Sequence, residues 1–169
     1  YGKSRNHHYG DIIFAARNGD TSALPEIKAL INDPLLPLLV RASTLELLEY
    51  FPYERVQETI AQMLQDPEPM LRMVAAQVYT SASAEDYIEK IVPLLYDPVK
   101  GVRANAAYSA SVIPADMLSE DEQVYLDNAL NEYLAWQEYN SDFAQGRHNI
   151  ASVLANLGRT NEAIDQYLE

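Results

Sequence analysis

Apolar residues recur every three or four positions in three segments of the chain, and each segment runs into an Asp-Pro step. The apolar positions are Ile27, Leu30 and Ile31; Ile60, Met63 and Leu64; and Ile91, Leu94 and Leu95. This spacing places each set on one face of a helix. Proline cannot continue a helix and disfavours helical geometry at the residue before it, so each Asp-Pro step predicts a helix end.

A second helix is predicted after each Asp-Pro step. Pro37 and Pro69 suit the first turn of a helix, where the missing N–H would have no intrahelical partner. An apolar-Arg pair and then alanines follow each time, and the arginines are Arg41, Arg72 and Arg103. Because one helix pair cannot bury its own apolar face, the three pairs are predicted to stack.

The three helix pairs keep a nearly constant register. The arginines are 31 residues apart both times, whereas Asp33, Asp66 and Asp97 are separated by 33 and then 31 residues. The first turn is therefore expected to be two residues longer than the others. A fixed period of this length indicates an internal helical repeat.

The two ends of the chain follow other patterns. Residues 9–18 are predicted to form a helix that stops at Gly19. Ser119 and Glu122 form a capping box for a helix that runs to about Tyr139. Gly158 ends a further helix, and the last helix follows it.

These boundaries predict three parts. Residues 1–21 are an N-terminal linker and helix, residues 22–114 are the three helix pairs, and residues 115–169 are a long helix with a partial further repeat. The last part is expected to continue the stack of helix pairs rather than to form a separate domain.

The Asp-Pro step, the apolar-Arg pair and the alanines together resemble the HEAT repeats of helical solenoid proteins, over about residues 22–113. In that family the aspartate and the arginine commonly form a ladder between adjacent repeats. The resemblance implies a ladder here that consists of Asp33, Asp66, Asp97, Arg41, Arg72 and Arg103. Such a carboxylate and guanidinium satisfy a partly buried turn, and a catalytic or anion-binding role is the alternative.

The last two helices resemble a tetratricopeptide repeat. Gly158, Ala163 and Tyr167 fall at the spacing of that motif, with Ala151 at its earlier small position and Arg147 at a position that is aromatic in the family. The repeat stops within its second helix, so we expect the chain to be a fragment of a longer protein. The expected fold is all-α, a superhelix (solenoid) of HEAT-like helix pairs followed by a tetratricopeptide-like repeat.

The order of these pieces resembles the C-terminal region of bacterial multihaem c-type cytochromes. The matching pieces are Tyr-Gly, His-Tyr-Gly, Ala-Ala-Arg-x-Gly-Asp, the HEAT-like units and EYLAWQEYNSDFAQGRHNIASVLANLGRTNEAI. In that family the haem-binding Cys-x-x-Cys-His motifs lie upstream, and none is present here. The resemblance implies the helical tail of a periplasmic electron-transfer protein that docks a redox partner, with haem only in a missing upstream region.

Composition and charge narrow the classes of partner. The 169 residues include no cysteine, which removes disulfides, thiolate metal sites and covalent haem attachment within this chain. The net charge of −13 argues against nucleic acid and anionic membranes as partners. Residues 115–169 hold two basic and 11 acidic residues, which favours a basic partner or a role in solubility.

Few residues suggest catalysis or metal binding. Neighbours such as His7 and His8 point about 100° apart on a helix, so they make a poor pair of metal ligands. Ligation of an upstream haem by one of them is the alternative. Acidic pairs lie in the first turns of predicted helices, where carboxylates favour the positive helix end. We predict no catalytic residue, no metal site and no membrane insertion for this chain.

Aromatic and basic side chains of the last third suggest a contact surface. Tyrosine and tryptophan are favoured anchors at interfaces, so we expect partner contacts from Trp136, Tyr139, Arg147 and His148. The expected function is a non-enzymatic scaffold whose concave surface docks a protein or peptide. The alternatives are a purely structural or dimerisation domain that braces an upstream domain, and an enzyme with a deep polar pocket.

Overall fold

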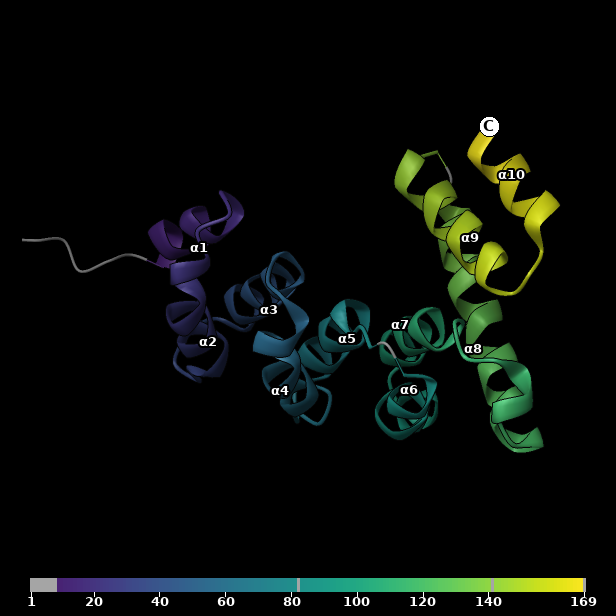
Figure 1. The fold of residues 1–169 in the computed structure, drawn as a ribbon, viewed down its shortest axis with the longest axis horizontal. Helices are drawn as coiled ribbons and strands as arrows, with labels where there is room; N and C mark the ends of the chain where they lie inside the picture. The colour runs from purple at the N-terminus through teal and green to yellow at the C-terminus, as the bar shows by residue number, and fades with distance from the viewer. Residues whose placement is uncertain (1–8, 82, 141, 169) are drawn as a thin grey trace, which may run out of the picture. The chain divides into compact units, whose positions relative to one another are not determined.

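The protein is helical throughout the part that the structure describes. The computed structural model describes residues 9–81, 83–140 and 142–168. Within these ranges the regular elements are ten α-helices and four short 3-10 helices, without a strand (Figure 1). The all-α prediction is confirmed, and the stacking of helix pairs into a superhelix stays a prediction. The chain divides into two compact units, Tyr1–Thr80 and Ser81–Glu169.

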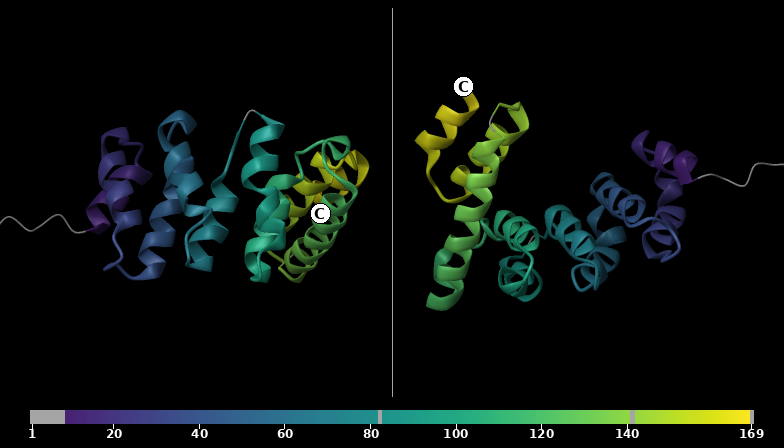
Figure 2. Two further views of the ribbon diagram at one scale, coloured as in Figure 1. Left: turned by 90° about the horizontal axis from the view of Figure 1, so that it is seen from below. Right: turned by 180° about the vertical axis from the view of Figure 1, so that it is seen from behind.

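The first unit consists of short helices that pack in chain order. Its α-helices are α1 (Tyr9–Arg17), α2 (Leu24–Asn32), α3 (Leu38–Glu46), α4 (Tyr53–Met63) and α5 (Pro69–Val78). The 3-10 helix η1 (Thr21–Ala23) leads into α2, and η2 (Leu47–Tyr50) continues α3. Helix α2 packs against α1 and α3, and α5 packs against α3 and α4 (Figure 2). The described elements therefore form two successive helix pairs preceded by α1.

The apolar faces predicted for the first two pairs are buried. Ile27 and Ile31 of α2 and Ile60 and Met63 of α4 are almost completely shielded from solvent. Ala75 and Ala76 of α5 are fully buried, as expected for small side chains where helices approach closely. Helix α1 ends where predicted, because Gly19 has a φ of +80°, a conformation that glycine adopts without strain.

The second unit combines one more helix pair with three longer helices. Its elements are α6 (Ala84–Lys90), η3 (Val92–Tyr96), α7 (Lys100–Ala110), η4 (Ala115–Met117), α8 (Glu120–Tyr139), α9 (Ala144–Asn156) and α10 (Thr160–Leu168). Helix α7 packs against η3 and α8, and α9 packs against α8 and α10. Ile150, Leu154 and Ala163 form a small core between the last helices, with Leu134 packed against it.

The first helix of the third pair differs from the sequence prediction. Ile91, Leu94 and Leu95 are buried as expected, but α6 ends at Lys90 and the chain continues as the 3-10 helix η3. Pro93 lies in the first turn of η3 and has no N–H to continue the α-helical hydrogen bonds. The tighter 3-10 turn instead forms bonds such as Leu94 N–H to the Ile91 carbonyl, at 2.9 Å.

Two glycines fix the geometry of the last three helices. Gly158 has a φ of +73° and ends α9, as the sequence predicts. Gly146 lies in the first turn of α9, and a Cβ added there would come within 2.6 Å of the backbone oxygen of Asn140. The close approach of the end of α8 to the start of α9 therefore depends on the missing side chain at Gly146.

Candidate binding site

Each Asp-Pro turn has the same local structure. The Oδ1 atom of the aspartate accepts a hydrogen bond from the backbone N–H two residues later, on the far side of the proline. The donors are Leu35 for Asp33 at 2.9 Å, Glu68 for Asp66 at 2.8 Å and Val99 for Asp97 at 2.8 Å. This Asx turn stabilises the reversal between the two helices of a pair and explains the choice of aspartate before the proline.

The arginine of each pair is the fourth residue of the second helix and donates to carbonyls at the preceding turn. Arg72 donates to the carbonyls of Asp66 and Pro67 at 2.7 and 3.0 Å. Arg103 donates to those of Asp97 and Pro98 at 3.0 and 3.3 Å. Carbonyls in a tight turn between two helices have no partner within a helix, so the guanidinium supplies donors where they are needed.

In the first pair the arginine donates to a different carbonyl. The Nε atom of Arg41 donates to the carbonyl of Ile31 at 2.8 Å, one residue before the end of α2. The turn after Asp33 is two residues longer than the turns after Asp66 and Asp97. The long side chain of arginine therefore reaches the helix end across the longer turn and the carbonyls of the turn itself where the turn is shorter.

Arg41 and Arg103 also form ion pairs with acidic residues of the element that packs next to them in the same unit. Arg41 lies 3.5 Å from the carboxylate of Asp66 in the next pair, and their side chains are only 13 % and 12 % exposed. Arg103 forms a bidentate pair with Glu132 of α8, with both bonds at 3.0 Å. After the third pair a glutamate from a long helix thus takes the place of the next turn's aspartate.

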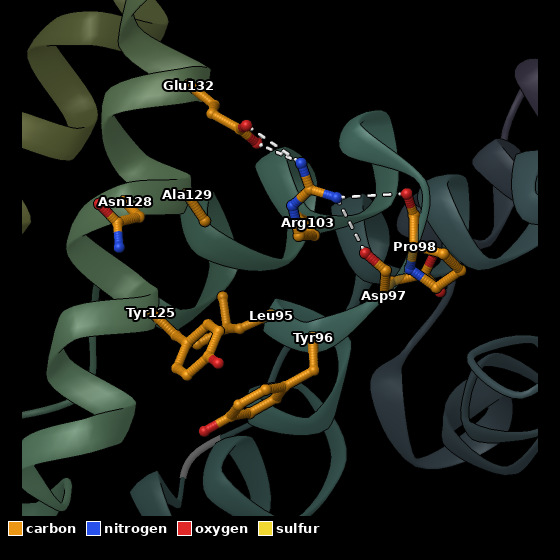
Figure 3. Close-up of a pocket in the computed structure, with 9 residues that line it drawn as sticks. All are labelled: Leu95, Tyr96, Asp97, Pro98, Arg103, Tyr125, Asn128, Ala129 and Glu132. Atoms are coloured by element: carbon orange, nitrogen blue, oxygen red, sulfur yellow. Dashed lines mark hydrogen bonds and ion pairs between the residues drawn. The ribbon is translucent and has the colours of Figure 1, made fainter.

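A groove of about 400 Å³ lies beside Arg103 in the second unit (Figure 3). One wall comes from the end of η3 and the turn that follows it, with Tyr96 and Asp97. The other wall comes from a single face of α8, because its lining residues are spaced by three or four positions. Those residues are Tyr125, Asn128, Ala129 and Glu132. The Arg103–Glu132 pair closes one end of the groove (Figure 3).

Two tyrosines, one from each wall of this groove, are in direct contact. The ring centroids of Tyr96 and Tyr125 are 4.3 Å apart, with an angle of 45° between the rings. Tyr96 keeps 48 % of its surface exposed and Tyr125 keeps 46 %. The two rings therefore hold each other in place while they still offer aromatic surface to a ligand.

The groove has a negative electrostatic environment. Partial burial, together with the negative charges of Glu122 and Asp121 and the neighbouring Tyr125, raises the pKa of Tyr96. Hydrogen bonds from the Ser119 hydroxyl and backbone N–H lower the pKa of Glu122. Glu122 is consequently ionised at neutral pH, while the phenol of Tyr96 stays neutral.

The residues predicted to contact a partner are not part of this groove. Trp136 and Tyr139 are exposed on α8, and Tyr139 is 88 % exposed. Trp136 contacts the buried ring of Tyr133, whereas His148 lies beside Tyr167 with ring centroids 5.7 Å apart. Arg147 is half-buried in the first turn of α9. Trp136 thus contacts a ring of its own helix, whereas His148 contacts a ring of α10, and a shared partner surface of the four residues stays a prediction.

A second groove lies between α8, α9 and α10. Leu134, Ile150 and Leu154 form its apolar base, and Glu138, Arg159, Glu162 and Asp165 contribute polar side chains. Arg159 and Glu162 form a bidentate ion pair with bonds of 2.8 and 2.6 Å. This groove has no exposed aromatic pair among its lining residues, so the Tyr96–Tyr125 groove is the stronger candidate site.

The described residues show neither a group of side chains arranged for a metal ion nor a helix suited to span a membrane. Among residues 9–81, 83–140 and 142–168, no three His, Asp or Glu side chains are arranged to hold a metal ion. No helix in these ranges is both long and apolar enough to cross a bilayer. His7 and His8 lie outside the described residues.

Comparison of the chain with protein families, curated proteins and solved structures gives no significant match. One feature of the sequence marks this groove, and it lies outside the pattern that the three repeats share. The position before Asp-Pro is Asn32 and Gln65 in the first two pairs but Tyr96 in the third. An aromatic residue at a position that is otherwise polar and exposed points to a contact role.

Proposed function

We propose that this chain is a non-enzymatic scaffold that docks an extended peptide segment of a partner protein in the Tyr96–Tyr125 groove. The observation that carries the proposal is the pair of half-exposed tyrosines in a groove between two packed elements. Tyrosine anchors contribute strongly to binding because they bury a large area with little loss of conformational entropy. The Arg103–Glu132 pair holds the walls of the groove before a ligand arrives, which lowers the entropic penalty of binding.

We further propose that the helix pairs are HEAT-like repeats, followed by a tetratricopeptide-like repeat, in one superhelix. The proposal is supported by the recurrence of the Asx turn and of the arginine at the fourth position of each second helix. A stack of such pairs offers a row of grooves of similar spacing to an extended ligand.

The sequence resemblance supports a more specific setting, the helical tail of a periplasmic multihaem cytochrome that docks a redox partner. This proposal is tested on the protein from its native host by intact mass and visible absorbance. A mass above 19.0 kDa with a Soret band is expected. A larger mass without haem absorbance would remove the cytochrome assignment and leave the scaffold function untouched.

The scaffold function is tested with a random peptide library displayed on phage and selected against the folded 169-residue chain. Selected peptides are then synthesised and titrated by calorimetry. We expect Tyr125→Ala to weaken binding by about tenfold or more, which corresponds to loss of an interface anchor. Tyr50→Ala removes an exposed ring of the same size from η2 in the first unit and serves as the control. Failure to select any peptide, or equal effects of the two substitutions, would contradict the proposal.

A dimerisation role is the second candidate. The observation that favours it is a set of exposed apolar side chains at the end of the second unit, namely Tyr139, Phe143, Ile164 and Leu168. Contiguous exposed apolar surface commonly marks an interface. Light scattering at several concentrations tests this candidate, because a constant monomer mass would exclude it.

A further inference from the structure

We propose that the Tyr96–Tyr125 groove selects an arginine side chain of the docked segment. The inference rests on the proposed scaffold function and specifies the chemistry of its ligand. In the proposed complex the guanidinium stacks on the exposed tyrosine surface and is balanced by the carboxylates of Asp121 and Glu122. The partner is therefore a protein with an arginine-containing extended segment.

Two carboxylates lie on α8 one turn before Tyr125. Asp121 and Glu122 precede it by four and three residues, which places them on the same face of the helix, and both are close enough to Tyr96 to act on it electrostatically. Glu122 is fixed in place by its hydrogen bonds to Ser119, at 2.8 Å to the backbone N–H and 2.7 Å to the hydroxyl. A cation on the exposed face of Tyr125 would therefore meet two negative charges within one helical turn.

The charges of the groove leave a negative balance. Arg103 is the one cation among the lining residues that the structure describes. Its guanidinium already donates hydrogen bonds to the carboxylate of Glu132 and to the carbonyls of Asp97 and Pro98. The remaining field is negative, which attracts a basic ligand and raises its rate of association.

The shape of the aromatic surface suits a planar group. The tyrosine rings are tilted by 45° and half-exposed, and they offer flat aromatic surface rather than a deep hole. A planar guanidinium stacks on such a surface, whereas the ammonium of lysine makes a point contact. Asn128, one turn further along α8, lines the groove with a side-chain amide, and amide groups can accept a hydrogen bond from a guanidinium through their oxygen. The site is therefore expected to prefer arginine over lysine.

The experiment compares three synthetic hexapeptides on the intact chain. The probes are acetylated, amidated Gly-Arg repeats and the same sequence with citrulline or lysine in place of arginine. Citrulline keeps the planar shape of arginine but has no charge. Binding is followed by ¹⁵N–¹H correlation spectra. We expect saturable shifts at Tyr96 and at Tyr125–Asn128 with the arginine probe, about tenfold weaker binding of the citrulline probe, and intermediate binding of the lysine probe.

Paired variants separate a local effect from net charge. Asp121→Asn with Glu122→Gln removes two charges, and glutamine at position 122 still completes the capping box. Glu54→Gln with Glu58→Gln removes two exposed charges from α4 in the first unit. We expect the first pair of substitutions to weaken binding of the arginine probe about fivefold to tenfold. The second pair is expected to change the affinity for this probe by less than about twofold. Tyr125→Phe is expected to retain binding, and Tyr125→Leu to lose it.

Several outcomes would overturn the inference. Equal affinity for the arginine and citrulline probes would mean that charge is not recognised. Equal effects of the two charge-removal pairs, or shifts spread over both units, would indicate diffuse attraction to an acidic surface. If library peptides without arginine bind at Tyr125 and the arginine probe does not, only this inference fails. If neither library peptides nor the arginine probe bind at the groove, the scaffold function fails as well.

Discussion

A single aspartate recurs at three turns of this protein and performs the same local task each time. Its carboxylate accepts a hydrogen bond from a backbone N–H across the following proline, and its own backbone N–H donates to a carbonyl three residues earlier and closes the preceding helix turn. The surroundings then separate the three residues. Asp33 is partly exposed, whereas Asp66 also forms a shielded ion pair with Arg41. The same Asp-Pro signal is therefore expected to contribute different amounts to the free energy of unfolding at different turns.

This difference predicts unequal effects of the same substitution. Asp66→Ala removes the Asx turn and leaves Arg41 without its carboxylate, so we expect the free energy of unfolding to fall by about 2–3 kcal/mol. Asp33→Ala, the matched control, removes an Asx turn alone and is expected to lower it by about 1 kcal/mol. Urea denaturation followed by circular dichroism measures both. Equal losses would mean that the Arg41–Asp66 pair adds nothing to stability.

The residue pattern predicts buried positions well and predicts the groove poorly. Ile27, Ile60 and Ile91 are buried as expected, because helical spacing alone decides which face is apolar. The contact of Tyr96 with Tyr125 joins residues that are 29 positions apart. It depends on the rotation of α8 about its own axis when it packs on η3, and the spacing of apolar residues does not fix that angle finely enough.

At the scale of elements, local signals determine where helices begin and end. Ser119 caps α8 with both bonds of a capping box, as the sequence predicts. The spacing of the apolar residues does not predict the effect of Pro93, which interrupts the first helix of the third pair. The apolar side chains still face the core, since a 3-10 helix returns to nearly the same face every three residues.

The capping box predicts a pH-dependent contribution to stability. Ser119→Ala is expected to lower the free energy of unfolding by about 1 kcal/mol at pH 7. Because the folded-state pKa of Glu122 lies below its ordinary value of 4.5, this contribution is complete above that pH and declines as the pH falls through the folded-state pKa. The difference between wild type and Ser119→Ala should therefore narrow in acid.

Ser152→Ala is the control for this measurement. The Ser152 hydroxyl bonds the carbonyl of His148 within α9 and caps no helix end. Its replacement should change stability by a few tenths of a kcal/mol at most and with no dependence on pH between 3 and 7. A constant difference for Ser119→Ala over the same range would show that Glu122 is not coupled to the cap.

For the whole molecule, the charge is concentrated in the second unit. Residues 81–169 hold five basic and fifteen acidic residues, a net charge of −10 out of −13. Like charges repel in the folded state, and dissolved salt screens that repulsion. The same charge is expected to attract an arginine-bearing ligand, and salt screens that attraction too.

Salt is therefore expected to move two properties of the protein in opposite directions. Between about 0.02 and 0.3 M NaCl, the melting temperature should rise while the affinity for the arginine probe falls severalfold. Thermal circular dichroism and calorimetry measure the two effects. A melting temperature that falls with salt would show that favourable ion pairs outweigh repulsion, and an unchanged affinity would contradict electrostatic recognition.

The arginine at the fourth position of each second helix has a consequence for how such a chain changes over time. Arg41 reaches Ile31 across a turn with two extra residues, and Arg72 and Arg103 reach the shorter turns with the same side chain. A flexible donor thus absorbs differences in loop length that a fixed cap would not tolerate. We therefore expect these turns to tolerate insertions and deletions of two residues without loss of the fold. Helix pairs can then be duplicated or lengthened during evolution while the turns between their helices keep the same hydrogen-bonding scheme.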